Sequence, residues 1–366
     1  MVKSHMNKLI NLFCKLVSIP SPSGKESAVT NFIKDYLEQK NIKTNIDDYG
    51  NLIATIPGDV SLPTLLFVAH MDTVETGDKP IKAIINGNII ETDKTTILGA
   101  DDKASVACLL DNIDEIIALA KHPNIIFAFT VREEDGKMGS SMLNIPDKID
   151  YCFNLDGSIE LGVVVSQTLG EMPFKIIIKG LAAHAAIEPE KGINAIITAA
   201  KIIDQLPIGK DENDTTLNIG TISGGKANNI VPDEVIINGS TRAFDQENID
   251  SILEKLKNII QTICDQTKCT YEIILLKDES VPCLPNNTNQ EILKIIKKAN
   301  NVMNLPYKII KGSYCSDANF LSTKYPTITL CRGSKFPHSV NEQISIDNLQ
   351  GFKNLVLEII KQVLGN

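Results

Sequence analysis

Four features that would point to other classes of protein are absent from this 366-residue sequence. No stretch approaches the ~18 apolar residues of a membrane span, and the N-terminal residues lack the apolar core of a signal peptide. The formal net charge of −9 argues against nucleic acid or an anionic membrane surface as a partner, because both require a basic footprint. The eight cysteines include no CxxC pair, as is typical of reduced intracellular thiols. We therefore expect a soluble, cytoplasmic protein.

The pattern of apolar residues predicts two domains, one inserted in the other. Short runs of Val, Ile and Leu, such as residues 64–70 and 124–131, alternate with helical stretches, which predicts a mostly parallel α/β sheet with helices on both faces. From residue 171 the order becomes β-α-β-β-α-β, that of a ferredoxin-like α+β domain. After residue 284 the first pattern resumes. We therefore assign residues 1–170 and 285–366 to one α/β domain and residues 171–284 to the insert.

The polar residues best suited to bind a metal or to catalyse a reaction follow the apolar strands. His70 and Asp72 end the first of these strands in "AHMDT", and side chains two apart on an extended chain point to the same side. The other acidic groups are Asp101 and Asp102, Glu133 and Glu134, and Asp156. In open α/β sheets the carboxyl ends of the strands are where ligands bind. Carboxylates that converge there repel one another, and a divalent cation is the usual compensation.

The available donors are sufficient for two metal ions. One imidazole and one carboxylate for each zinc ion, with a shared carboxylate and a shared water, would give each ion four ligands. His70, His184 and His338 are the candidate histidines, and two of them would supply the imidazoles. The alternatives remain open at this point, because a single acidic pair is usually a solvated turn and a lone histidine is usually structural.

Taken together and in order, the motifs resemble those of a known family. "AHMDT", "LGADDKAS", "REEDGKMGS", "LDGS" and "HSVNE" are similar to the motifs of the dinuclear zinc aminopeptidase and carboxypeptidase family that includes peptidase T, carboxypeptidase G and the aminoacylases. The resemblance extends over nearly the whole chain, including "GLAAHAAIEPEKGINAI" in the insert. It is greatest to the peptidase T-like tripeptidase branch.

The resemblance implies a role for each motif in a zinc-binding catalytic domain. It implies that His70 and Asp156 bind one zinc ion, that Glu134 and His338 bind the other, and that Asp101 bridges the two. Glu133 would be the general base and Asp72 would orient His70, while the peptide bond between Asp101 and Asp102 would be cis.

The insert would be a lid and dimerisation domain that contacts the substrate. The resemblance implies that His184 stabilises the oxyanion. In dimeric relatives the corresponding histidine can come from the neighbouring subunit. Asn229 and Arg242 resemble substrate-anchoring positions, and an arginine fork suits a peptide carboxylate, although a surface salt bridge is the competing interpretation for Arg242. The motif "YCSDANF" resembles a small-residue motif near the metal, which would place Ser316 and Asp317 at the pocket wall.

The expected function is therefore that of a zinc-dependent exopeptidase acting on the N-terminal bond of short peptides, tripeptides in particular. We expect two zinc ions, with cobalt or manganese as substitutes, and a homodimer. A carboxypeptidase or an N-acyl amino acid amidohydrolase on the same scaffold is the alternative, because metal motifs do not select the substrate. A non-catalytic, metal-binding dimeric scaffold is the alternative from another class.

Overall fold

The computed structural model describes residues 2–77, 79–285 and 290–364 and divides into two compact units. The first comprises Met1–Gln167 and Pro285–Asn366, and the second comprises Thr168–Leu284. The second unit begins three residues before the insert that the sequence predicts at 171–284. Thr168 pairs with Leu284 at the other end of the unit, and strand β9 (Gly170–Lys179) pairs from its first residue with its neighbour in that unit.

The first unit is built on an eight-stranded sheet with the order β1-β2-β6-β3-β7-β15-β8-β14. Its strands are β1 (Lys43–Ile46), β2 (Leu52–Ile56), β3 (Leu65–His70), β6 (Ile125–Thr130), β7 (Tyr151–Gly157), β8 (Val163–Thr168), β14 (Lys308–Gly312) and β15 (Thr327–Cys331). The central strands β6, β3, β7 and β15 run parallel, whereas β1, β2 and β8 pair antiparallel. The predicted α/β class is confirmed.

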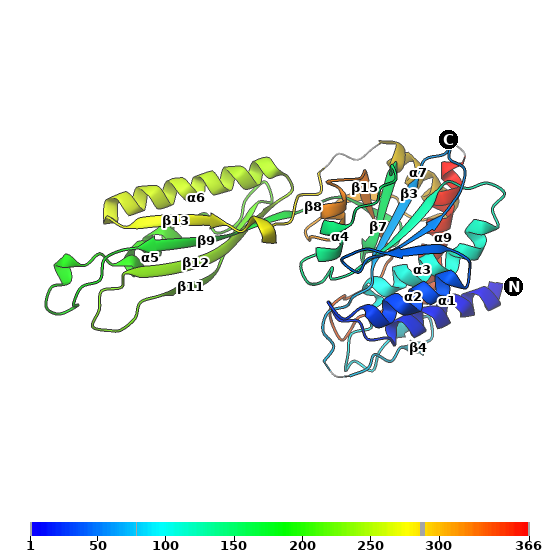
Figure 1. The fold of residues 1–366 in the computed structure, drawn as a ribbon, viewed down its shortest axis with the longest axis horizontal. Coiled ribbons are helices and arrows are strands. Elements are labelled where there is room, and N and C mark those ends of the chain that lie inside the picture. The colour runs from blue at the N-terminus through cyan, green and yellow to red at the C-terminus, as the bar shows by residue number, and fades with distance from the viewer. Residues whose placement is uncertain (1, 78, 286–289, 365–366) are drawn as a thin grey trace. The chain divides into compact units, whose positions relative to one another are not determined.

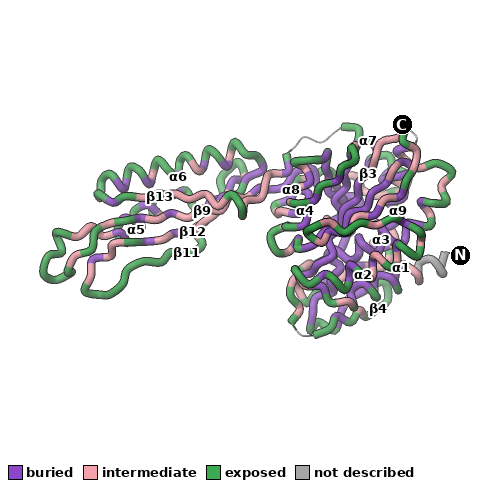
Figure 2. The backbone as a smooth tube through the Cα atoms, in the orientation of Figure 1, coloured by how far each residue is buried: buried purple, intermediate pink, exposed green. Residues whose placement is uncertain are grey.

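Helices cover the sheet unequally (Figures 1 and 2). The helices of this unit are α1 (Val2–Val17), α2 (Ser27–Glu38), α3 (Ala100–Ile117), α4 (Met138–Met142), α7 (Gln290–Val302), α8 (Asp317–Leu321) and α9 (Ile346–Val363). Phe67 of β3 packs into one core with the long helices, while its neighbours Leu66 and Val68 pack into a second, smaller core with Leu321 of α8. Successive strand residues point to opposite faces, so the second face is covered by short elements rather than long helices.

The central strands are apolar along their whole length because both of their faces are covered. All residues of β3 and of β6 are buried. Phe67 stacks on Phe153 of β7 with ring centroids 4.9 Å apart and meets Phe127 of β6 edge-on at 6.2 Å. Aromatic contacts of this kind add stability beyond the burial of their area, and they fix the strands whose ends carry the polar residues.

A small sheet accompanies the large one. It has the order β16-β5-β4 and consists of β4 (Ile84–Asn86), β5 (Ile89–Glu91) and β16 (Ile344–Ser345). Ile344 pairs with Ile90, which ties the loop after β15 to the segment that precedes α3.

The second unit is an antiparallel sheet with the order β10-β11-β12-β9-β13 and two helices. Besides β9, its elements are α5 (Ala195–Gln205), β10 (Gly209–Lys210), β11 (Thr216–Gly224), β12 (Glu234–Ala243), α6 (Gln246–Thr267) and β13 (Thr270–Leu275). Ile176, Ile202 and Ile260 belong to the core that α5 and α6 share with the sheet. The predicted β-α-β-β-α-β order is present, with the two-residue β10 added.

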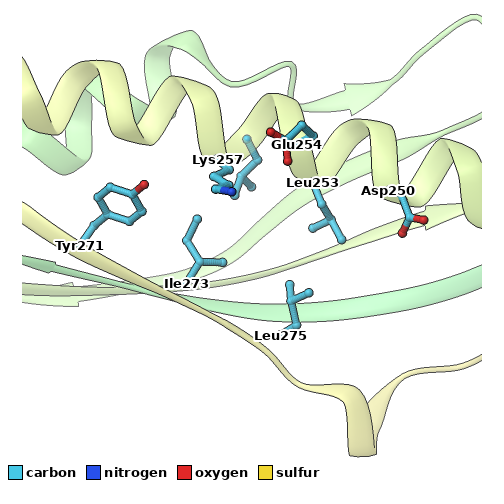
Figure 3. A pocket seen from close by; sticks show the side chains of 8 residues that line it. Asp250, Leu253, Glu254, Lys257, Tyr271, Ile273 and Leu275 are labelled. Carbon is cyan, nitrogen blue, oxygen red and sulfur yellow. The ribbon is translucent and has the colours of Figure 1, made fainter.

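A groove runs between α6 and β13 (Figure 3). Leu253 lines it from α6, and Tyr271, Ile273 and Leu275 line it from β13. Throughout the described ranges, none of the helices is long and apolar enough to cross a bilayer.

Asn51, immediately before β2, anchors the loop that carries Glu133. Its buried side chain accepts a hydrogen bond from Val131 N at 3.1 Å and donates to Gly139 O at 3.0 Å and to Asp47 Oδ2 at 2.7 Å. Position 139 must be glycine here, since a Cβ would lie 2.3 Å from the Val131 carbonyl oxygen and 2.5 Å from Asn51 Oδ1.

Replacing Asn51 with alanine should therefore lower the free energy of unfolding by about 2–4 kcal/mol, because it leaves the buried Val131 amide without its acceptor. The exposed Asn86 provides a matched control. Asn86→Ala should change the free energy of unfolding by less than about 0.5 kcal/mol. Urea unfolding of both variants measures the difference; equal stabilities would show that Asn51 does not anchor the loop.

Candidate metal centre

The side chains predicted as metal ligands meet at the carboxyl ends of the parallel strands. His70 ends β3, Glu134 follows β6, Asp156 lies near the end of β7, Asp101 lies in the first turn of α3, and His338 lies in the loop after β15. Parallel strands bring their carboxyl ends to one edge of the sheet, which is where open α/β sheets bind ligands.

Asp101 lies between the two histidines. Its Oδ1 is 3.2 Å from Nε2 of His70, and its Oδ2 is 3.5 Å from Nε2 of His338. His70 Nε2 is also 4.0 Å from Asp156 Oδ1, and His338 Nε2 is 2.7 Å from Glu134 Oε1. Each carboxylate oxygen of Asp101 therefore faces a different imidazole, an arrangement in which one carboxylate can bridge two cations.

The donor atoms are close enough to share cations. His70, Asp101 and Glu134 offer ligand atoms within 4.8 Å of one another, and so do His70, Glu133 and Asp156. Imidazole nitrogen with carboxylate oxygen is a donor set that zinc accepts. The residues present thus fit a dinuclear centre, in which His70 and Asp156 can hold one ion and Glu134 and His338 the other.

The crowding of carboxylates favours the protonated forms of two predicted ligands. Burial and the neighbouring Asp101 raise the pKa of Asp156 well above its usual value. Burial opposes protonation of His70, but its hydrogen bonds to Asp101 and Asp72 hold its pKa well above the usual value. Either group coordinates a metal only in its unprotonated form, so metal binding here competes with protons.

Asp72 fixes both His70 and the acidic loop. It is fully buried, its Oδ1 is 3.4 Å from His70 Nδ1, and the same oxygen accepts from Glu133 N at 3.0 Å. Its Oδ2 accepts from Glu134 N at 3.1 Å and from Ser23 Oγ at 2.6 Å. Although burial opposes ionisation, the hydrogen bonds from His70 and Ser23 hold the pKa of Asp72 below its usual value. The carbonyl oxygen of Asp72 is closer still to His70 Nδ1, at 3.0 Å, so Asp72 orients the imidazole with its backbone and the two amides with its carboxylate.

Glu133 lies beside the predicted ligands with a carboxyl group suited to proton transfer. Burial raises its pKa to about 8, against the opposing effect of His70 and Lys137, and Lys137 Nζ is 3.1 Å from its Oε1. Cations bound nearby would lower this value toward neutrality. A general base works best when its pKa lies near the operating pH.

Glu342 is a structural member of the site that the sequence analysis missed. Its buried carboxylate accepts hydrogen bonds from Leu98 N at 2.9 Å, Gly99 N at 2.7 Å and Asp101 N at 2.9 Å. These amides lead into α3, so Glu342 fixes the backbone that carries Asp101. Glu342 lies in the motif "HSVNE". Its contact with the start of α3 could not be predicted, because the two segments are far apart in the sequence.

Arg332 is the second residue that the sequence analysis missed. Its guanidinium is fully buried and lies 2.7 Å from Asp101 Oδ1, 2.9 Å from Asp102 Oδ1 and 3.3 Å from Asp156 Oδ1. Burial, together with the neighbouring Asp101, raises the pKa of Asp102 to about 6, even though Arg332 and His70 oppose the shift. The peptide bond between Asp101 and Asp102 is cis, as the resemblance implied.

A cavity of about 260 Å³ opens beside these groups. It is lined by Asp101, Glu133, Glu134, Lys137, Asp156, Ser158, Tyr314, Cys315, Pro337 and His338. The prediction that Ser316 and Asp317 line the pocket is wrong. Both are buried, because Ser316 caps α8 and Asp317 accepts a hydrogen bond from Thr130 Oγ1 at 2.5 Å. Their neighbour Cys315 contributes to the wall instead.

The remaining predicted residues lie in the second unit. His184 and Asn229 are adjacent there, since Ala185 N donates to Asn229 O at 2.9 Å and His184 is bridged to Ile230. Arg242 lies in β12, and its guanidinium is 3.0 Å from Glu171 Oε2. Arg242 thus takes part in the kind of surface ion pair that was the competing interpretation.

Known proteins resemble the chain in both its sequence and its structure. Residues 168–268 match the M20 peptidase dimerisation domain, and residues 51–176 match peptidase family M28. The Bacillus subtilis protein YqjE is 31% identical over 97% of this chain and 98% of its own. Aminopeptidase PepT from Bacillus cereus superimposes with a TM-score of 0.89 at 30% identity, over 98% of this chain and 99% of that one.

A tripeptidase from Staphylococcus aureus superimposes equally well, with a TM-score of 0.89 at 32% identity over 99% of both chains. Identity at this level over nearly the full length, together with the ordered motifs at the strand ends, establishes the family. The chain belongs to the M20 family of peptidases, among its peptidase T-like members.

Proposed function

We propose that the protein is a metal-dependent exopeptidase of the peptidase T type, which releases the N-terminal residue of short peptides, tripeptides in particular. Similarity to an aminopeptidase PepT and to a tripeptidase over almost the whole chain supports this substrate class. The observation that carries the proposal is the position of Asp101, with one carboxylate oxygen toward His70 and the other toward His338.

The proposed metals are two zinc ions. His70 and Asp156 would hold one ion, Glu134 and His338 would hold the other, and Asp101 would contact both. This set of nitrogen and carboxylate donors suits zinc. Cobalt or manganese can occupy similar donors. Zinc bound there would supply Lewis acidity, which polarises the scissile carbonyl and makes a nearby water molecule acidic.

Glu133 is the proposed general base. It lies on the wall of the cavity that the proposed ligands line, where its carboxylate can take a proton from the attacking water and pass it to the leaving amine. Asp72 holds the backbone amide of Glu133, and Lys137 holds its Oε1. The base is therefore oriented from both ends before substrate arrives.

His184 is the proposed donor to the oxyanion. Its Nδ1 accepts hydrogen bonds from Ala186 N and Ile187 N, both at 3.2 Å, so the neutral ring carries its proton on Nε2. That N–H is available to donate to a developing negative charge. Asn229, beside it, and Arg242 are proposed substrate contacts; Arg242 would have to exchange Glu171 for a substrate carboxylate.

We further propose that the protein acts as a homodimer in the cytoplasm. The match of residues 168–268 to a peptidase dimerisation domain supports a dimer, in which His184 could serve the neighbouring subunit. The cytoplasmic assignment rests on the cysteines, since Cys108, Cys152 and Cys264 form no disulfide, as is typical of reduced intracellular thiols.

A peptide panel tests the substrate class. The zinc-reconstituted protein should release the N-terminal residue from tripeptides with a free amine and leave N-acetylated copies of the same peptides intact. Mass spectrometry of the products identifies the bond that is cut. Cleavage of N-acyl amino acids but not of free tripeptides would establish the amidohydrolase alternative, and bound metal without turnover of any member would favour the scaffold.

Replacing Glu133 with glutamine tests the general base. The amide keeps the shape of the side chain but accepts no proton, so kcat should fall by about 10²–10⁴-fold while the zinc content, measured by elemental mass spectrometry, stays that of the wild type.

The control is Glu75→Gln, which alters a side chain that is 72% exposed and should leave kcat unchanged. A Glu133→Gln variant that turns over as fast as the wild type would show that another group takes the proton.

A further inference from the structure

Arg332 brings a permanent positive charge into the candidate metal centre. It follows β15 directly, its side chain is fully buried, and its Nε donates to Ser334 Oγ at 3.1 Å. One terminal nitrogen donates to Asp102 Oδ1 at 2.9 Å and lies 3.4 Å from Leu155 O. A guanidinium does not lose its proton in proteins, so this charge is present whether or not metal is bound.

The contacts of Arg332 are confined to one side of Asp101. Its guanidinium touches Asp101 Oδ1, the oxygen that faces His70, at 2.7 Å and touches Asp156 Oδ1 at 3.3 Å. Asp101 Oδ2 faces His338 instead, at 3.5 Å. Among the described residues, Arg332 forms ion pairs with Asp101, Asp102 and Asp156 and none with Glu134, which pairs with His338 instead. The two proposed metal positions therefore have different electrostatic surroundings.

Lys137, which lines the cavity, does not offset this difference. Lys137 Nζ is 3.1 Å from Glu133 Oε1, and Glu133 is the proposed base rather than a ligand. Coulomb energies fall with distance, and buried charges are screened little by salt. An ion placed between His70 and Asp156 would thus share two donor oxygens with a fixed cation, whereas an ion at Glu134 and His338 would not.

We propose that Arg332 makes the two metal positions unequal, so that the position at Glu134 and His338 fills first and the position at His70 and Asp156 fills second, with lower affinity. This inference rests on the proposed function in that it takes the cluster to hold two metal ions. Arg332 acts here as a positioning residue, because it works through the carboxylates and not on substrate.

Arg332 also stabilises the cluster before metal binds. Asp102 is fully buried, and a buried carboxylate is costly without a counter-ion. Arg332 and Asp102 form a buried ion pair, and removing one partner leaves the charge of the other uncompensated. Each partner can be neutralised by its own substitution. Neutralising Arg332 removes the repulsion on the second ion. Neutralising Asp102 leaves that repulsion in place and removes the charge that partly balances it.

Titration calorimetry of the metal-free full-length protein with Zn²⁺ tests the inference. The wild type should bind in two steps whose dissociation constants differ on the order of 100-fold. Asp156→Asn should abolish the weaker step and retain the tighter one. Arg332→Met should bring the two constants to within about tenfold of each other, and Arg332→Lys, which keeps the charge, should preserve their separation.

Two further measurements keep the result decisive if Arg332→Met does not fold, as judged by circular dichroism. Asp102→Asn should widen the separation between the two constants, and substituting Co²⁺ should give absorption spectra that change in two successive stages. Two equal steps in the wild type, loss of the tighter step in Asp156→Asn, or an unchanged separation in both Arg332→Met and Asp102→Asn would each overturn the inference. Binding of fewer than two ions would instead contradict the proposed dinuclear centre.

Discussion

Repulsion among carboxylates at the ends of neighbouring strands is the constraint on which this structure depends. Asp101, Asp102 and Asp156 offer oxygens within 4.8 Å of one another, and all are largely removed from water. Such a cluster can persist only if positive charge or protons compensate it. Arg332 supplies a fixed charge on one side, and the raised pKa values of Asp156 and His70 favour their binding of protons. Metal ions would replace those protons.

Two further acids in the site serve a different purpose. Asp72 and Glu342 accept hydrogen bonds from backbone amides, and those amides belong to the segments that carry the proposed ligands and base. Charge-assisted hydrogen bonds of this kind are stronger than neutral ones. The ligand geometry is thus fixed by the backbone before any cation arrives, which is the preorganisation that catalytic sites require.

Much of this arrangement follows from local patterns in the sequence. The alternation of an extended chain places His70 and Asp72 on one side, and strands such as β3 and β6 can be recognised from their unbroken apolar runs. Family resemblance ordered the motifs and implied the bridging role of Asp101. The thin cover on one sheet face was not predictable, because it depends on Leu321 and its neighbours in a helix of only five residues.

The residues that escaped prediction act through long-range contacts. Arg332 meets Asp102 across 230 positions of sequence, and Glu342 meets Asp101 across 241. A motif shows which residue types are adjacent along the chain. It does not show which side chains contact a helix that is far away in the sequence. The same limit explains Ser316, whose hydroxyl caps α8 instead of facing the cavity.

The central claim is that Asp101 lies between two metal positions. Anomalous diffraction at the zinc edge, from crystals of the zinc-reconstituted protein, tests it most directly. If Asp101 bridges two zinc ions, two peaks should appear, each about 2.0–2.2 Å from one carboxylate oxygen of Asp101, with His70 beside one and His338 beside the other. A single peak, or peaks that Asp101 does not contact, would contradict it.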